Sequence, residues 1–591
     1  MPSATRTRSR TTAASPAAHH RPAPGEVFIR MYGQGVGDCF LLMFPRVPGG
    51  ADKRPFYVLV DCGVVGGTPS GSERMRQVVR DIKATTLDEE VRDDDNKAKG
   101  HIDLLVITHE HWDHLSGFVQ AEEEWKQIQV DALWTAWTEK QDEDGLPHVL
   151  KEILAKQRMA VAEAADRALR LGLAEQHEVL LSLMGFYGDA TSEGQGFAVA
   201  KGVSDAFQIA KGLVPPERHI CCEPGEVRPL MGTGAVAYVL GPPRNDDRLR
   251  QMKPTKRAPE TYQEEEPGQA GPDGGPALRG TEFSLEAMSG GRSAFNAFAM
   301  PFVGQMLAAG PEADAGKDPT PEQLTQRKAF ERSFPFEAPL RIPLPIAERE
   351  AAEHPALASY FEPVSNWRRI DFDWLSASAD FALRADALTN NTSLVLAFEL
   401  PAKAEGAERG VLLFAGDAQV GNWLSWDDIT AWLPKDGAIA AQKKPDIGDL
   451  LKRLVFYKVG HHGSHNATLK AKGVERMREE NLTAFVPVSA TVAHKVKGWG
   501  RMPLETLLNA LAERAAGRVV LPNGQIWPAQ PGPASAAGHA QIGLKLADEK
   551  LPAVLKDGET IEEQTPLWIE IGISNQNRRG RAGAAAGVPR A

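Results

Sequence analysis

The feature that most constrains this chain is a dense cluster of metal-ligand residues placed directly after an apolar segment. Residues 101–114 read HIDLLVITHEHWDH, and the run LLVI is short, apolar and ends in two β-branched residues. Such a run predicts a buried β-strand. The histidines and the aspartate that follow it therefore lie together at the carboxyl end of that strand.

The cluster has the pattern HxHxDH and offers ligands to two metal ions. Residues two apart in an extended backbone point the same way, so His109 and His111 can present their imidazoles to one ion. Asp113 and His114 lie beyond the turn and can serve a second ion. Two divalent ions roughly 3.5–4 Å apart lower the pKa of a bridging water and polarise the group that it attacks. The pattern predicts a hydrolase that uses a metal-bridged hydroxide and needs no serine or cysteine nucleophile.

Further strands are predicted towards both ends of the chain. The apolar segments EVFIRMYG, DCFLLMFP and RPFYVLVDCG fall within 26–63. From 390 onward the segments NNTSLVLAFEL, GVLLFAGD, RLVFYKVGHHGS, AFVPVSA and RVVLPNG follow, and GAVAYVLGPPR is a further strand in the middle of the chain. Helices are predicted around 72–83 and, from apolar residues at helical spacing, at 148–171. The strands at the two ends are expected to share one core.

Charge and cysteine content limit the partners and the compartment. The net charge of −11 means that the surface as a whole repels nucleic acid and membrane phosphates, so any polyanion must be met by a local basic cluster. The four cysteines form no CxxC pair and no disulfide framework. No stretch of eighteen apolar residues predicts a membrane span, and residues 1–25 lack the apolar centre of a secretory signal. We expect a soluble cytoplasmic protein with no membrane partner.

Two later motifs also place ligand residues directly after apolar strands. LLFAGDA carries Asp417, and FYKVGHHGS carries His461 and His462. Together with GQGVGDCFLL, LVDCG, ITHEHWDHLSG and NNTSLVL, in this order, they resemble the metallo-β-lactamase superfamily and, within it, the hydrolase domain of DNA-uptake proteins of the ComEC type. The resemblance implies an α/β fold, a four-layer αββα sandwich with the site at one edge of its two sheets.

The resemblance also implies a domain organisation. The motifs anchor about half of the chain, which is expected to form a single domain at 26–574 with about 140–385 as a long insertion. Within the insertion, 245–280 is dense in Pro and Gly and is expected to be a flexible loop. The ends of the chain, 1–25 and 575–591, are basic and of low complexity and are expected to be disordered tails.

Individual residues take roles from the same resemblance. Asp417 is expected to bridge both ions. His461 is expected to be the last ligand of the second ion, with His462 as a supporting or substrate-facing neighbour, although which of the two histidines is the ligand stays open. Many relatives supply a third histidine to the first ion where this chain has Asn390, so the first ion is expected to be held weakly.

Two acidic residues near the start of the chain match supporting positions of the family. Asp61 is expected to support the site by hydrogen bonding, and for Asp38 a supporting role and a purely structural one are equally open. The expected metal ligands are thus His109, His111, Asp113, His114, Asp417 and His461, with Asp113 and Asp417 also expected to be catalytic. The expected supporting or substrate-contacting residues are Asp38, Asp61, Asn390, Lys458, His462, Lys495 and Lys497.

Zinc is the default ion for a site rich in histidine, and manganese is the alternative, because coordination by carboxylates and water also suits it. The resemblance to the DNA-uptake proteins favours a phosphodiester, in a nucleic acid or a nucleotide, as substrate. Lys458, Lys495 and Lys497 lie on either side of the last motif and could bind phosphate, and Trp499 could stack on a base. The alternatives are a non-phosphate substrate such as a thioester, or a regulatory or scaffold protein that binds a protein partner through the insertion.

Overall fold

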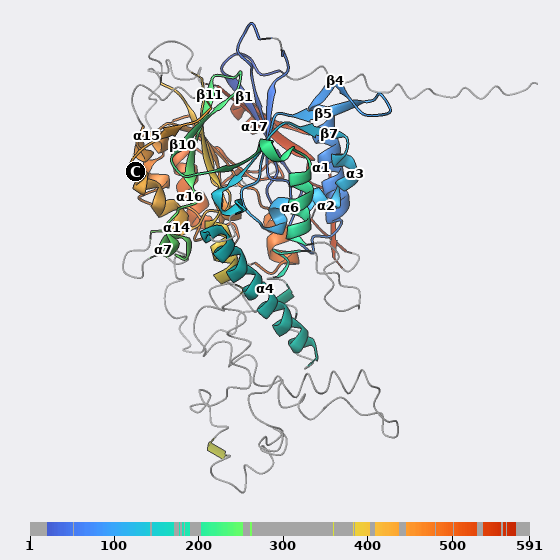
Figure 1. The fold of residues 1–591 in the computed structure, drawn as a ribbon, viewed down its shortest axis with the longest axis vertical. Helices are drawn as coiled ribbons and strands as arrows, with labels where there is room; N and C mark the ends of the chain where they lie inside the picture. Colours follow the sequence, from blue (N-terminus) through green and yellow to red (C-terminus); the bar gives the residue numbers. More distant parts are fainter. Residues whose placement is uncertain are drawn as a thin grey trace, which may run out of the picture.

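A computed structural model of the chain shows two large β-sheets packed face to face, with helices on their outer sides (Figure 1). The mixed α/β class predicted from the sequence is confirmed. The described residues lie mainly in 21–188, 202–251 and 384–574, with short gaps inside these ranges, and at 260–262. Most of the expected loop at 245–280, and both expected tails apart from residues 21–25, lie outside the described residues.

The first sheet has eight strands and combines both ends of the chain, because its last long strand pairs with its first one. Its strands, in spatial order, are β19 (Leu544–Leu546), β22 (Trp568–Ser574), β1 (Glu26–Tyr32), β2 (Phe40–Phe44), β3 (Phe56–Val60), β6 (Leu104–Val106), β8 (Leu133–Ala136) and β9 (His219–Cys222).

The second sheet has nine strands and is built mainly from the later part of the chain. Its strands, in spatial order, are β14 (Leu433–Pro434), β10 (Glu226–Leu230), β11 (Ala235–Gly241), β12 (Val395–Glu399), β13 (Val411–Phe414), β15 (Leu454–Lys458), β16 (Thr483–Phe485), β17 (Val519–Val520) and β18 (Ile526–Trp527).

Alternation of side chains along the strands gives each sheet one face in a shared core and one face under helices. On β12, Leu396 and Phe398 belong to the core between the sheets, whereas Val395 and Ala397 pack under helices. Helices α1 (Gly71–Thr85), α2 (Trp112–Gln120), α3 (Glu122–Trp125) and α6 (Val203–Gly212) cover the eight-stranded sheet. Helices α14 (Val420–Ser425), α15 (Ile447–Lys452) and α16 (Glu505–Arg514) cover the nine-stranded sheet.

Part of the range expected as an insertion lies within the two sheets. Strand β9 extends the first sheet and β10 and β11 join the second, with β11 paired to β12 across a long gap in sequence. A short helix, α7 (Asp246–Leu249), lies where the flexible loop was expected to begin, and it packs on α14. The chain between 203 and 249 therefore belongs to the same body as the motif-bearing strands.

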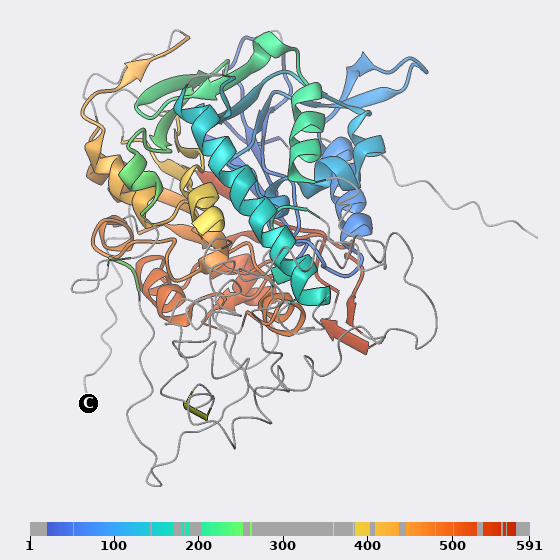
Figure 2. The ribbon, with the colours of Figure 1, turned by 60° about the horizontal axis from the view of Figure 1, so that its bottom comes forward.

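The long helix predicted at 148–171 is α4 (Leu146–Arg170), and Figure 2 shows it crossing in front of the strands. Smaller elements complete the described fold: a three-stranded sheet of β4 (Leu87–Arg92), β5 (Ala98–Ile102) and β7 (Ile128–Val130), a hairpin of β20 (Val554–Lys556) and β21 (Glu559–Glu562), and α17 (Ala536–Ile542) beside β19.

The directions of the strands bring the motifs to one edge. Strand β3 runs parallel to β6, and β13 runs parallel to β15, so the loops that follow these strands emerge at common edges of the two sheets. Strand β12 runs antiparallel to β13, which places the segment before β12 at the same edge. The backbone N–H of Leu394, at that point, donates to the carbonyl of Thr108 beyond β6 and joins the sheets there.

The core between the sheets offers a direct test of this packing. Phe414 on β13 is buried among the rings of Phe40, Phe398 and Phe456, with centroid distances of 5.6, 5.9 and 5.5 Å. We predict that Phe414→Ala lowers the free energy of unfolding by about 3–5 kcal/mol, because the lost contacts leave a cavity that rigid sheets cannot close. Urea denaturation followed by circular dichroism measures it. The exposed Val47→Ala is the control and should change stability by less than about 0.5 kcal/mol; equal effects of the two substitutions would contradict the packing.

Candidate metal centre

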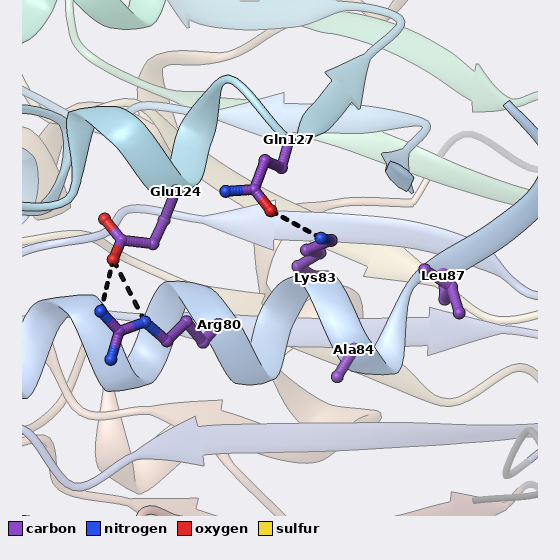
Figure 3. A pocket seen from close by; sticks show the side chains of 6 residues that line it. All are labelled: Arg80, Lys83, Ala84, Leu87, Glu124 and Gln127. Carbon is purple, nitrogen blue, oxygen red and sulfur yellow. Dashed lines mark hydrogen bonds and ion pairs between the residues drawn. The ribbon is translucent and has the colours of Figure 1, made fainter. Parts of the chain in front are cut away.

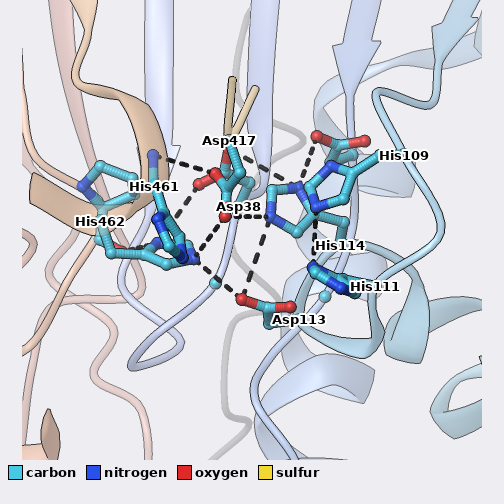
Figure 4. Close-up of polar contacts among 12 residues, drawn as sticks. Asp38, His109, His111, Asp113, His114, Asp417, His461 and His462 are labelled. Atoms are coloured by element: carbon cyan, nitrogen blue, oxygen red, sulfur yellow. Dashed lines mark hydrogen bonds and ion pairs between the residues drawn. The ribbon is translucent and has the colours of Figure 1, made fainter. Parts of the chain in front are cut away.

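The predicted ligand residues come together from loops at the ends of three strands (Figure 4). His109 and His111 follow β6, and Asp113 and His114 lie in the first turn of α2. Asp417 follows β13, and the two histidines of the GHHG turn follow β15. All of these side chains are buried. The sequence thus positions the group through strand ends drawn from both sheets.

The backbone is strained at this edge. Asp61, His461 and His462 all have positive φ angles, of 56°, 44° and 53°, a region that non-glycine residues rarely adopt. Such strain persists only where the surrounding structure enforces it, and it concentrates at functional sites. The surrounding structure therefore holds the turn after β15 in a left-handed conformation. This conformation directs the side chains of His461 and His462 to different positions.

Two glycines let the early motifs approach the HxHxDH loop closely. A Cβ atom on Gly63 would lie 2.4 Å from the carbonyl carbon of Asp113, and one on Gly37 would lie 2.6 Å from its carbonyl oxygen. The N–H of Asp38 donates to that same carbonyl at 3.0 Å, and the N–H of Gly63 donates to the carbonyl of Asp38. The GxGD and DCG motifs thus tie Asp38 and Asp61 to the ligand loop.

His109 and His111 form the first ligand pair. The Nε2 atom of His109 lies 3.0 Å from the Nδ1 atom of His111. Burial lowers the pKa of His109 well below its usual value and that of His111 to about 3, so both imidazoles are neutral and have a lone pair to give. Two neutral, buried nitrogens facing each other are suited to share one cation.

A second group of potential ligand atoms lies next to this pair. His462 Nε2 is 2.8 Å from Asp113 Oδ2 and 3.3 Å from Asp417 Oδ2, and His114 Nε2 is 3.2 Å from the same Asp417 oxygen. Ligands about 2.0–2.1 Å from a tetrahedral zinc ion lie roughly 3.3–3.4 Å from one another, so these separations fit one ion. Asp38, His114, Asp417 and His462 offer atoms that all lie within 4.8 Å of one another. This buried group of two aspartates and two histidines could hold a metal ion.

The geometry separates the two histidines that the sequence left open. The imidazole of His462 contacts the carboxylates of Asp113 and Asp417. The imidazole of His461, the expected ligand, is directed away from these two carboxylates. The Nε2 atom of His461 lies 3.4 Å from Asn390 Nδ2, and its backbone N–H donates to Asp417 Oδ1 at 3.1 Å. Of the two histidines, His462 is therefore the one that lies among the carboxylates of the buried group, because the left-handed turn aims its imidazole there.

Supporting hydrogen bonds orient the imidazoles of the second group. Asp61 Oδ2 lies 2.8 Å from Nδ1 of His114, and the carbonyl of Pro487 lies 3.0 Å from Nδ1 of His462. Both bonds place the proton on Nδ1 and leave Nε2 directed at the carboxylates. Asp61 also accepts from the N–H and the hydroxyl of Thr108. The supporting role expected for Asp61 matches this arrangement.

Lys458 is part of the interior and not of the surface. Its Nζ forms an ion pair with Asp38, lies 3.2 Å from Asp417 Oδ1 and donates to the carbonyl of Gly416 at 2.8 Å, and its side chain is 1% exposed. Of the two roles expected for Lys458, the supporting one fits this placement, whereas direct contact with a substrate phosphate does not. The lysine offsets the charge of two buried carboxylates instead.

Charge compensation determines the protonation of the second group. Burial would lower the pKa of His462, but the carboxylates of Asp417 and Asp113 raise it to about 10. Burial would raise the pKa of Asp113, but the charges of His114 and His462 lower it to about 2. The pKa of Asp417 also lies well below its usual value, since the same histidines and Lys458 outweigh burial. The cluster therefore pairs ionised carboxylates with protonated imidazoles.

One basic residue after the last motif, Lys497, lies beside aromatic rings that extend to His111. Lys495 is exposed, and Lys497 donates to the carbonyl of Gly66 at 2.8 Å and lies over the ring of Trp499. Trp499 stacks on Phe186 at 5.4 Å between ring centroids, and Phe186 in turn lies 5.6 Å from the ring of His111. Trp499, expected to stack on a base, thus belongs to an aromatic wall beside His111.

Sequence reasoning missed several residues around the cluster. Thr108 and Pro487 act through a hydroxyl and a carbonyl, which no ligand pattern reveals. Asp386 is a buried aspartate whose Oδ1 lies 3.7 Å from His111 Nε2, and burial together with the charges of other aspartates raises its pKa well above its usual value. Its spacing of four residues from Asn390, helical in character, was the one signal in the sequence that could have identified it.

A separate surface pocket lies between α1 and α3 (Figure 3). Arg80 bonds to Glu124 Oε1 at 2.7 Å, and Lys83 donates to Gln127 at 2.6 Å. The cations that line this pocket are thus engaged by its own walls.

Comparisons with protein families, curated proteins and solved structures found no match for this chain. Among the helices that the structure describes, none combines the length and the apolar character needed to cross a membrane.

The protonation of the cluster predicts that metal uptake is linked to pH. The raised pKa values of His114 and His462 mean that both are protonated at pH 7, and a cation that takes their lone pairs must displace about two protons. Affinity should therefore rise as pH rises from 6 to 8. Calorimetric titration with Zn²⁺ in two buffers of different ionisation enthalpy measures the protons released. Equal heats in both buffers would contradict the assignment.

Proposed function

We propose that the protein is a metal-dependent hydrolase of the metallo-β-lactamase superfamily and that its two sheets and flanking helices form the four-layer αββα sandwich of that superfamily. The motifs that resemble the superfamily in sequence are also those that meet in space. Strand ends from both sheets supply them, which is the placement that the resemblance implies.

The observation that carries the proposal is the presence of two adjoining ligand sets. His109 and His111 make the first, and Asp113, His114, His462 and Asp417 make the second. The rings of His109 and His114 are 4.2 Å apart between centroids, so the two sets are neighbours, as two-metal sites with ions about 3.5–4 Å apart require. We assign two divalent ions to these sets, zinc by default and manganese as the alternative.

Two bound ions would supply Lewis acidity and a water of lowered pKa. The chain's own part is to hold the ligands in place. Lys458 and the N–H of His461 occupy Oδ1 of Asp417, so only Oδ2 is directed towards the imidazoles. Ser393 Oγ accepts from the N–H of Asp417 at 3.1 Å and fixes the loop that carries it. Asp417 is thereby prevented from rotating away from the position of a shared ligand.

A phosphodiester, in a nucleic acid or a nucleotide, is the substrate class that we propose. Its support is the resemblance to the hydrolase domain of DNA-uptake proteins and the placement of Lys497 beside the aromatic wall of Trp499 and Phe186, with the exposed Lys495 two residues earlier in the sequence. Cations offset phosphate charge, and aromatic rings stack on bases without regard to sequence. In a chain of net charge −11, such a local group is needed to attract an anion.

The test of function removes the shared carboxylate. We expect Asp417→Ala to reduce phosphodiester hydrolysis by more than about 100-fold, which exceeds the usual cost of changing a residue that only supports a ligand. Asp417→Asn keeps the shape of the side chain without its charge and should be similarly impaired while the fold, measured by circular dichroism, is kept. Hydrolysis of a panel of DNA, RNA and cyclic nucleotides with added Zn²⁺ or Mn²⁺ is the measurement.

Asp95→Ala is the matched control, because Asp95 is exposed and lies in the turn between β4 and β5. It should leave hydrolysis unchanged. Activity of Asp417→Asn close to that of the wild type would contradict the assignment of Asp417. Activity confined to thioesters or lactams across a wider panel would leave a metal-dependent hydrolase but reject the phosphodiester.

The basic residues give a separate prediction about substrate binding. Replacing Lys495 and Lys497 with Ala should raise KM several-fold and flatten its dependence on salt, because each phosphate contact that is lost removes one unit of counterion release. Metal content should not change, since neither lysine is a proposed ligand. Kinetics at two salt concentrations test this, and an unchanged KM would exclude these lysines from the substrate site.

A further inference from the structure

A histidine that binds a metal through one ring nitrogen carries its proton on the other, and in a buried site that proton needs an acceptor. Three imidazoles of the cluster have one. Nδ1 of His114 faces Asp61, and Nδ1 of His462 faces the carbonyl of Pro487. Nδ1 of His109 lies 3.0 Å from the Thr108 hydroxyl, whose own proton is given to Asp61, so its oxygen is left to accept.

His111 is the fourth imidazole, and it is turned the other way. Its Nδ1 faces His109 Nε2 at 3.0 Å, so a cation shared by this pair would take Nδ1 and the proton would reside on Nε2. That Nε2 lies 3.7 Å from Oδ1 of Asp386. Neither atom has a hydrogen-bond partner within the described part of the chain, and both residues are buried. A movement of about 0.8 Å would bring them to hydrogen-bonding distance.

Asp386 is itself held in place from the other side. It lies in a helical stretch at 384–391, directly before β12, one turn ahead of Asn390. The Nδ2 atom of Asn390 donates to Asp386 Oδ2 at 3.1 Å, which leaves Oδ1 directed at His111. Asn390 occupies the position at which the sequence suggested a substitute for a third histidine, and its amide is engaged by this carboxylate.

We propose that Asp386 is a positioning residue of the first metal site: its carboxylate accepts the Nε2 proton of His111 and so presents the Nδ1 lone pair to the ion, with Asn390 orienting the carboxylate. The inference rests on the proposed two-metal function and deepens it. It makes the segment before β12 part of the site and gives each of the four imidazoles a fixed tautomer.

The test is a calorimetric titration of the metal-free full-length protein with Zn²⁺, supported by elemental analysis after dialysis. Asp386→Ala should weaken binding of one ion by about 10–100-fold, as losses of supporting carboxylates do, and leave the other ion bound as in the wild type. Asp386→Asn should have a smaller effect, because its amide oxygen can still accept the proton. A melting temperature of the metal-free variants close to that of the wild type separates this effect from a general loss of structure.

A double-mutant cycle shows whether Asp386 acts through His111. In a His111→Ala background, replacing Asp386 should cause no further loss of affinity. The matched control Asp95→Ala should leave metal affinity unchanged both in the wild type and in the His111→Ala variant. Wild-type affinity for both ions in Asp386→Ala, or a full and additive loss in the double variant, would overturn the inference and leave the proposed function standing. A wild-type protein that binds no ion would overturn both.

Discussion

The structure depends on the compensation of charge in its buried interior. Four carboxylates, those of Asp38, Asp61, Asp113 and Asp417, are buried within a single cluster, and an unpaired buried charge is too costly to persist. Two devices offset this charge. Lys458 pairs with two of the carboxylates, and His114 and His462 are protonated beside the others. A protonated imidazole is a replaceable cation, so the same arrangement that stabilises the buried carboxylates prepares them to exchange protons for metal.

The fold positions this cluster, because the loops at the ends of its strands hold the ligand residues in fixed places. Parallel neighbours such as β3 and β6, or β13 and β15, deliver their following loops to one edge, and the hydrogen bond from Leu394 to Thr108 joins the sheets there. The NNTS motif contributes through Ser393, which holds the Asp417 loop, and Asn391, which binds the carbonyls of Leu249 and Gln251. Residues remote in sequence are thus fixed to within the tolerance that a ligand set requires.

Much of this could be predicted from the sequence because the informative residues are local. Apolar runs indicated the strands around the motifs, and the HxHxDH spacing indicated paired ligands for a physical reason. The choice between His461 and His462 could not be made, since it depends on a left-handed turn at consecutive histidines that no propensity predicts. Lys458 seemed a phosphate contact because its burial is a tertiary property. The strands β9 to β11 were assigned to an insertion because β9 and β11 join the sheets through β8 and β12, which lie far along the chain. Asp386 lies outside every motif, and its helical spacing from Asn390 does not indicate a contact with His111, which the structure shows through the distance between the two side chains.

The measurement that bears most directly on this account is anomalous X-ray diffraction from crystals of the protein grown with Zn²⁺. The account predicts two neighbouring anomalous peaks, one in contact with His109 and His111 and the other in contact with Asp113, His114 and His462. The carboxylate of Asp417 should contact the ion of the second peak and face the ion of the first. No peak at the cluster would contradict it, as would a peak held by His461 with His462 turned away.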